Sequence, residues 1–218
     1  MHEIPSLIYV VDDDADSRES LLYLLQTVGL TARAFSSAAE FLQSLDIHQP
    51  GCLVCDVRMP GMSGLDLFEK LTAAGSQLPV IFITAYADVP MAVRALKSGA
   101  AEFIEKPFHA QTMLERIQRA LATDRQRREE VASWSDFQQR LESLTEKERE
   151  TLAFVRDGAP NKAIAMRLSI TERAVEMRRA SLMKKLQAHS LAELIRLVTE
   201  AEIHSEHRSS RRTAPGSL

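Results

Sequence analysis

Carboxylates gather where the first apolar run of the sequence ends. The stretch YVVDDDAD (9–16) passes from β-prone residues directly to three adjacent aspartates, Asp12, Asp13 and Asp14. Like charges held side by side in a cleft require raised pKa values or a bound cation. A charge run is ordinarily a solvated surface, and Asp14 or Asp16 is suited simply to capping the next helix. Asp12 and Asp13 differ because they stand at the end of a predicted buried strand.

Polar side chains also end three later apolar runs. They are Asp56 in LVCDVRMPG, Thr84 in VIFITAY and Lys106 in FIEKPF. Carboxylates alone indicate a generic cation site, whereas carboxylates with a hydroxyl and an ammonium indicate a cation held beside a phosphoryl group. We therefore predict that Mg²⁺, with Mn²⁺ as a substitute, offsets the repulsion among Asp12, Asp13 and Asp56. Asp56 would attack phosphorus and form an acyl phosphate, while Lys106 and Thr84 stabilise the transferring oxygens.

The segments that must position these residues alternate between the two-residue period of strands and the 3.6-residue period of helices. Short β-like runs alternate with helical patterns in the first half of the chain, which predicts a parallel sheet covered on both faces, an α/β domain. Ligands bind beyond the carboxyl ends of such strands, so the four polar sites share one rim. The predicted strands are Leu7–Val11, Thr31–Phe35, Cys52–Asp56, Val80–Thr84 and Ala101–Glu105.

Residues 5–125 resemble the receiver domain of two-component response regulators. The resemblance implies a flavodoxin-like, doubly wound fold with Asp56 as phosphoacceptor. It is carried, in order, by DD at 12–13, D-x-x-M-P at 56–60 with Gly64, T-A at 84–85 and K-P at 106–107.

The same resemblance assigns roles to individual residues. It implies Mg²⁺ on Asp12, Asp13, Asp56 and the backbone carbonyl of Arg58, with Thr84 and Lys106 on the phosphoryl group. It further implies a cis Lys106–Pro107 bond and a Thr84–Phe103 pair that rearranges on phosphorylation.

Charge divides the chain into parts with different partners. Residues 1–121 carry a net charge of −6, residues 122–144 carry −1, and residues 145–218 carry +4. Residues 110–144 fit one long helix or two consecutive ones. We predict a receiver domain at 1–125, a helical linker at 126–140, a DNA-binding domain at 141–204 and a disordered tail at 205–218.

The basic part has helical periods only. Thr145 with Glu148 predicts a capping box, Thr171 caps a third helix, and four short helices fit a helix-turn-helix unit. Residues 141–203 resemble the LuxR-type helix-turn-helix of the NarL/FixJ regulators, with the FixJ-like branch favoured by DVPMAV (88–93) and EKPF. Ala174 and Arg178 depart from that pattern. The matching stretches are LTEKERETL (144–152), NKAIAMRL (161–168), R-x-x-x-M-K-K-L (179–186) and AELIRLV (192–198).

The helix predicted at Thr171–Leu186 has a net charge of +3, which suits the major groove. Its basic residues, Arg173 among them, alternatively form no more than a solvated face. By resemblance Glu176, Met177 and Ala180 face base edges, while Lys162, Arg178, Arg179 and Lys185 face phosphates. A core role is predicted for Met166, Leu168, Ile170, Val175, Leu182 and Leu186.

The fourth helix, predicted at Leu191–Ile203, is apolar on one face. By resemblance Leu191, Leu194, Ile195 and Val198 supply a dimer contact. The alternative is that they pack within their own domain.

The leading hypothesis is a transcription regulator in which phosphorylation of Asp56 switches dimerisation, exposure of the DNA-binding domain, or both. We do not expect an enzyme, apart from slow self-phosphorylation and dephosphorylation. Its predicted partners are a sensor histidine kinase, promoter DNA, a second copy of the chain and RNA polymerase. No apolar run approaches the roughly 18 residues that span a bilayer, so we predict a cytoplasmic protein. The alternatives are a Mg²⁺-dependent phosphatase with an aspartate nucleophile and a constitutive DNA-binding protein. Cys52 and Cys55 are predicted to be buried apolar residues rather than a metal or redox pair.

Overall fold

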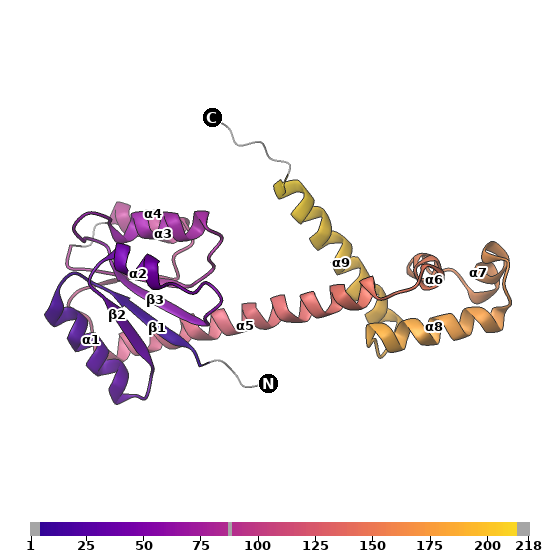
Figure 1. Ribbon diagram of the computed structural model, residues 1–218, viewed down its shortest axis with the longest axis horizontal. Helices are drawn as coiled ribbons and strands as arrows, with labels where there is room; N and C mark the ends of the chain where they lie inside the picture. Colours follow the sequence, from indigo (N-terminus) through magenta and orange to yellow (C-terminus); the bar gives the residue numbers. More distant parts are fainter. Residues whose placement is uncertain (1–4, 87–88, 213–218) are drawn as a thin grey trace. The chain divides into compact units, whose positions relative to one another are not determined.

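The computed structural model describes residues 5–86 and 89–212, with residues 202–212 described as backbone only. The chain forms two compact units that divide between Glu130 and Val131. The strands described in the first unit are β1 (Leu7–Val11), β2 (Ala32–Phe35), β3 (Gly51–Asp56), β4 (Val80–Thr84) and β5 (Glu102–Glu105) (Figure 1). Its helices are α1 (Ala15–Thr27), α2 (Ala38–Ser44), α3 (Gly64–Ala73), α4 (Val89–Lys97) and the first part of α5 (Ala110–Glu142).

The strands form one parallel sheet in the order β2-β1-β3-β4-β5. This is the flavodoxin-like order, so the predicted fold is confirmed. Each strand begins within one residue of its predicted start. β3 lies at the centre of the sheet and is buried along its whole length, which explains its continuous apolar sequence.

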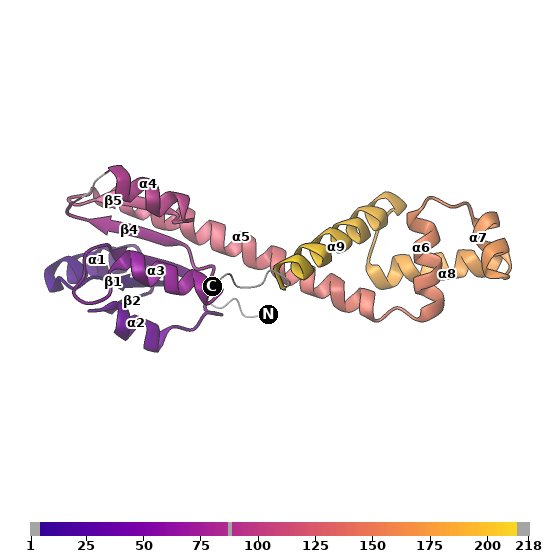
Figure 2. The ribbon, with the colours of Figure 1, turned by 90° about the horizontal axis from the view of Figure 1, so that it is seen from above.

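Helices cover both faces of the sheet (Figures 1 and 2). On one face Tyr9 and Phe82 pack with residues of α2, α3 and α4. On the other face Ile8 and Ile81 pack with residues of α1 and α5. Because adjacent strand residues point to opposite faces, the same short strands build both cores.

The two cysteines lie on opposite faces of β3. Cys55 belongs to the core beneath α2, α3 and α4, and Cys52 belongs to the core beneath α1 and α5. Both are fully buried, and burial raises the pKa of the Cys52 thiol to about 12. The predicted role as small buried apolar residues is confirmed, and their opposite orientation excludes a shared metal or disulfide.

Helix α5 is one uninterrupted helix, so of the two predicted alternatives the single long helix is correct. Beyond Val131, Trp134 and Leu141 pack against the core of the second unit, and Phe137 is buried in it. Part of the predicted linker at 126–140 is therefore core of the second unit. That unit begins earlier than residue 141 because these aromatic side chains cover its helices.

All the regular secondary structure described in the second unit is helical. Its core is built by Val155, Ile164, Val175 and Leu182, among others. After α5 it contains α6 (Glu146–Arg156), α7 (Asn161–Leu168), α8 (Glu172–Leu186) and α9 (Leu191–Arg212). The predicted capping box of Thr145 and Glu148 and the predicted cap at Thr171 are both present.

Two predictions for this unit were wrong. Met166 is 75% exposed rather than core, because Ile164 and Ala165 occupy the buried side of the short helix α7. Helix α9 continues past Ile203 to Arg212, so residues 205–212 are helical rather than disordered. No proline or glycine occurs between Thr199 and Ala214 to end the helix sooner. Residues 213–218 lie outside the described residues.

Within residues 5–86 and 89–212, none of the helices combines the length and the apolar character needed to cross a bilayer.

Candidate functional site

The predicted rim residues meet at the carboxyl edge of the sheet. Asp12 follows β1, Asp56 ends β3, Thr84 ends β4 and Lys106 follows β5. These four strands are consecutive neighbours in the sheet, so their carboxyl ends lie side by side. The sheet order therefore brings together residues that are up to 94 positions apart in the sequence.

Lys106 joins two of the carboxylates. Its Nζ donates to Asp12 Oδ2 at 2.7 Å and to Asp56 Oδ2 at 2.8 Å. Burial favours the neutral amine, but the hydrogen bonds and charges of Asp12 and Asp56 outweigh burial and raise the pKa of Lys106. The ammonium form is therefore the one present at neutral pH. The Lys106–Pro107 bond is cis, as the resemblance implies.

Asp12 has further partners that the sequence interpretation missed. Its side chain accepts from the Asp14 N–H at 3.0 Å and from Ser17 Oγ at 2.7 Å. Its backbone carbonyl accepts from Arg18 at 2.7 Å. Asp14 caps α1 through the Ser17 N–H, as one alternative predicted. The first turn of α1 thus fixes Asp12, and only the proximity of Ser17 and Arg18 to the acidic run could have suggested it.

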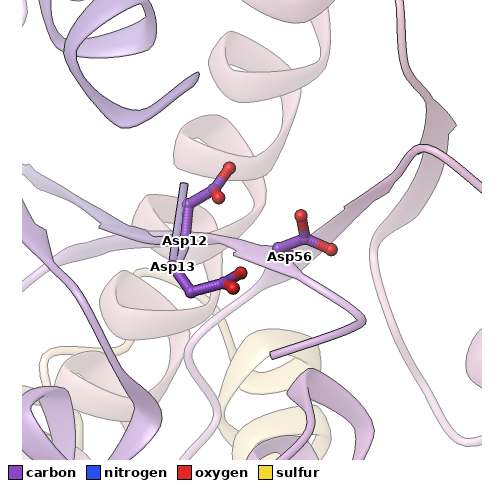
Figure 3. A group of neighbouring side chains, drawn as sticks. All are labelled: Asp12, Asp13 and Asp56. Atoms are coloured by element: carbon purple, nitrogen blue, oxygen red, sulfur yellow. The ribbon is translucent and has the colours of Figure 1, made fainter. Parts of the chain in front are cut away.

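Three carboxylates converge beside Lys106. Oxygens of Asp12, Asp13 and Asp56 all lie within 4.8 Å of one another (Figure 3). Asp12 and Asp56 are buried, whereas Asp13 is exposed. Such a set of oxygen donors fits Mg²⁺, which binds few carboxylates and keeps several waters. The arrangement can hold one divalent cation with Asp13 at its open side.

The first residue of α3 approaches Asp56 closely. A Cβ added at Gly64 would lie 2.2 Å from the Asp56 carbonyl oxygen, so only glycine fits there. The Asp56 carboxylate also accepts from the Arg58 N–H at 3.0 Å. The Arg58 N–H thus holds the carboxylate of Asp56, while Gly64 allows the following helix to begin against the Asp56 backbone.

Arg58 lines a hollow next to Asp13 and also contacts Tyr86. The Arg58 guanidinium lies 5.1 Å from the ring centre of Tyr86, a cation–π contact. A shallow hollow of about 620 Å³ opens next to Asp13, lined also by Arg58, Met59 and Met91. The acidic edge is therefore open to solvent at Asp13.

Two other predicted residues, Thr84 and Phe103, lie on the neighbouring strands β4 and β5. Thr84 is buried, and its hydroxyl accepts from the Tyr86 N–H at 3.3 Å. Phe103 is partly buried, with its ring centre 6.4 Å from that of Phe82. The Thr84–Phe103 switch and the Arg58 carbonyl as a metal ligand stay predictions.

In the second unit, α8 presents one exposed face. Arg173, Glu176, Met177 and Ala180 are exposed at spacings of three and four residues, which puts them on the same side of the helix. Met177 is 69% exposed, although it is apolar. Thr171 and Lys162 are exposed as well.

The other basic side chains predicted to contact phosphates are held within the unit. Arg179 donates to Asn161 Oδ1 at 2.8 Å, and Lys185 donates to Glu148 Oε2 at 2.8 Å. Arg178 makes longer bonds of 3.3 and 3.4 Å to the Lys147 carbonyl and to the hydroxyl of Thr151. Their contact with DNA stays a prediction.

Glu148 is the buried acid at the centre of this network. It accepts from Lys185, from Ser181 Oγ at 2.7 Å and from the Thr145 N–H at 2.8 Å. In that order these hydrogen bonds lower the pKa of Glu148 from its usual 4.5 to about 2. The carboxylate thereby ties the start of α6 to α8.

The residues predicted to form a dimer contact do not share one environment. Leu194 and Val198 are buried in the core of their own unit, at 2% and 6% exposure. Ile195 is half-buried, and Leu191 is 41% exposed. Leu191 and Ile195 are thus the more accessible members of the predicted set.

Two family models match the chain. Residues 8–118 match the response regulator receiver domain, and residues 142–198 match the luxR family of bacterial regulatory proteins. The chain is 42% identical over 200 residues to the response regulator protein TmoT of Ectopseudomonas mendocina, covering 92% of this chain and 90% of that protein. It is 41% identical over 190 residues to the transcriptional regulatory protein FixJ of Rhizobium meliloti, and the match covers 87% of this chain and 93% of that protein.

Solved structures of response regulators resemble this chain along most of its length. The response regulator StyR superposes with a TM-score of 0.81 at 42% identity, covering 90% of this chain and 99% of StyR. Full-length FixJ from B. japonicum superposes with a TM-score of 0.57 at 39% identity, and the match covers 91% of this chain and 98% of FixJ.

We expect the second unit to lose stability in acid as Glu148 becomes protonated. Its folded-state pKa is depressed, so its contribution is complete above about pH 4.5 and is lost as the pH falls toward 2. Glu148→Gln should lower the free energy of unfolding at pH 7 by about 1–3 kcal/mol and flatten its pH dependence in that window. Trp134 is the sole tryptophan and packs against this core, so its fluorescence during urea unfolding reports on this unit.

Glu150→Gln is the matched control, because Glu150 is an exposed glutamate of the same helix. It should retain the stability and the pH dependence of the wild type. Equal acid sensitivity of Glu148→Gln and the wild type between pH 4.5 and 2 would contradict the role given to the network.

Proposed function

The chain belongs to the response regulators that join a receiver domain to a LuxR-type DNA-binding domain, and on this premise we propose that phosphorylation of Asp56 controls its binding to DNA. A receiver domain implies a histidine kinase as partner, and a LuxR-type domain implies DNA binding by a transcription regulator. The observation that carries the proposal is the contact of Lys106 Nζ with Asp12 and Asp56 at 2.7 and 2.8 Å, beside Asp13.

The reaction requires an in-line attack on phosphorus. A carboxylate oxygen of Asp56 forms the new P–O bond while the P–N bond of a kinase phosphohistidine breaks and the imidazole leaves with the electron pair. Lys106 is within reach of the Asp56 carboxylate and so can stabilise the equatorial oxygens of the transferring group, with the hydroxyl of Thr84 as the second predicted donor.

Asp12, Asp13 and Asp56, together with the Arg58 carbonyl, would hold Mg²⁺. When bound, the ion supplies positive charge that offsets the carboxylates and the incoming phosphoryl oxygens. The Lys106 ammonium group already offsets part of the negative charge of Asp12 and Asp56. Asp13 is exposed and open to a cation.

The output step is the insertion of α8 into the major groove. The exposed face of Arg173, Glu176, Met177 and Ala180 supports base and phosphate contacts along one side of that helix. We propose that phosphorylation favours a homodimer, which raises the affinity for DNA because two linked recognition helices bind together. RNA polymerase is the proposed partner downstream of DNA.

A phosphatase is not favoured. A haloacid-dehalogenase-like enzyme places a second aspartate two residues after its nucleophile, and here that position is Arg58. The relatives are named as regulators of response or transcription, which indicates a non-enzymatic role.

Asp56→Asn should reduce phosphoryl incorporation from a labelled acyl phosphate with Mg²⁺ to background, because the nucleophile is lost. Asp14→Asn is the matched control, since Asp14 is an exposed helix cap in the same acidic region. It should label at the wild-type rate. Persistent labelling of Asp56→Asn would show that another residue is the acceptor.

Asp13→Asn should weaken Mg²⁺ binding by about tenfold, because the open carboxylate of the cluster is removed. Calorimetric titration with MgCl₂ measures the dissociation constant, again with Asp14→Asn for comparison. An unchanged constant in Asp13→Asn would refute the assignment of the acidic cluster as the metal site.

Arg173→Ala should weaken binding to a mixed-sequence DNA duplex and lower the slope of log K against log salt by about one, because one phosphate contact is lost. Arg125→Ala removes an exposed arginine of α5 instead and should leave the slope unchanged. Fluorescence anisotropy at several salt concentrations measures both. The same slope in Arg173→Ala and the wild type would exclude Arg173 from the interface.

A further inference from the structure

Helix α5 leaves the apolar core of the receiver unit near Leu121, yet a polar cluster keeps it attached beyond that point. Met113, Ile117 and Ala120 are buried against the sheet, and Leu121 is partly buried. Between residues 122 and 130 the one buried side chain is Asp124, which is only 1% exposed. A buried carboxylate requires partners, and their identity shows what the helix is attached to.

Asp124 is bound from two sides. Arg127 and Arg128, one turn further along α5, donate to its carboxylate at 2.6 and 2.8 Å. The Gly51 N–H, at the start of β3, donates to it at 3.0 Å. The carboxylate therefore links the helix directly to the central strand.

Arg128 adds two bonds to the loop that leads into β3. Its Nη1 donates to the His48 carbonyl at 2.8 Å, and its Nη2 donates to the Gln49 carbonyl at 2.9 Å. With Nε on Asp124, three N–H groups of one planar guanidinium are used at once. A lysine could not make this set of bonds, because its ammonium lacks the fixed fork.

Gly51 completes the geometry. A Cβ at this position would lie 1.9 Å from the carbonyl oxygen of Leu7, so a larger residue would push β3 away from β1. Close pairing of these strands places the Gly51 N–H where Asp124 accepts it. We call Asp124, Arg127 and Arg128 the α5 clamp.

We propose that the α5 clamp extends the receiver unit along α5, so that bending of the linker begins after Arg128 rather than after Leu121. Asp124 and Arg128 are then positioning residues for the output domain. β3 runs from Gly51, which contacts the clamp, to the phosphoacceptor Asp56 at its other end. The clamp thus connects the strand that carries Asp56 to the part of α5 that precedes the second unit.

The proposal also has a regulatory part, which rests on the proposed function. If the clamp fixes the path of α5, its loss weakens the dependence of DNA affinity on phosphorylation without affecting the chemistry at Asp56.

The first test is hydrogen exchange on the full chain. Arg128→Ala should speed exchange of the amides of residues 122–130 by about tenfold or more, while those of residues 114–121 keep their protection through the apolar core. Arg125→Ala is the matched control, because it removes an exposed arginine from the same turn of α5. Equal exchange at 122–130 in Arg128→Ala and Arg125→Ala would overturn the proposal.

Arg128→Ala also leaves the buried Asp124 with fewer partners, and the whole receiver unit can lose stability as a result. Faster exchange in β3 and β4 would reveal this. Arg128→Lys then decides, because it keeps a positive charge beside Asp124 and loses the fork to His48 and Gln49. Faster exchange confined to residues 122–130 supports the clamp, and wild-type exchange refutes it.

The second test compares DNA affinity before and after treatment with acetyl phosphate and Mg²⁺. In Arg128→Ala the gain in affinity should fall by about threefold or more, with phosphoryl incorporation at Asp56 unchanged. If Arg128→Ala keeps the full gain in DNA affinity although its amides at 122–130 exchange faster, the regulatory part of the proposal is refuted. The role of the α5 clamp in positioning the helix would still stand. If the wild type incorporates no phosphoryl group, the proposed function fails, while hydrogen exchange still decides the clamp.

Discussion

The contact of one ammonium group with two carboxylates organises the acidic edge of the sheet. Lys106 offsets the charges of Asp12 and Asp56, which are buried too deeply for water to do so. The contact is possible only because β1, β3, β4 and β5 are parallel neighbours whose carboxyl ends share an edge. Lys106 thereby links the residue that follows β5 to the carboxyl ends of β1 and β3.

In the second unit the group at the centre of the charged contacts is an acid rather than an ammonium group. A buried acid, Glu148, accepts from one basic side chain, Lys185, and from the hydroxyl of Ser181, both on α8. Arg179 is likewise held by Asn161 at the start of α7. These bonds fix α8 against α6 and α7 before DNA arrives, which lowers the ordering cost of binding. The exposed positions around Arg173 and Met177 remain available for the groove.

Much of this could be predicted from the sequence because the signals are local. Each strand is a short apolar run, and the residue that follows a parallel strand must lie at the carboxyl edge of the sheet. The convergence of the acidic residues and Lys106 follows from that rule alone. Capping at Thr145 and Thr171 is local as well, since a cap bonds N–H groups within three residues. The sequence does not distinguish one long helix from two consecutive helices at α5, because the polar run before Val131 has no apolar periodicity.

What escaped prediction depends on contacts between distant segments. Leu194 and Val198 share a face with Leu191, yet burial by the other helices separates them from it, and no spacing rule reveals which side of α9 meets the core. Asp124 and Arg128 form an ordinary i, i+4 pair in sequence, typical of a solvated helix. Only the approach of the loop before Gly51 converts that pair into a buried attachment. On the proposal above, this polar tertiary contact determines how far along α5 the receiver unit extends, and hydrophobic periodicity carries no signal for it.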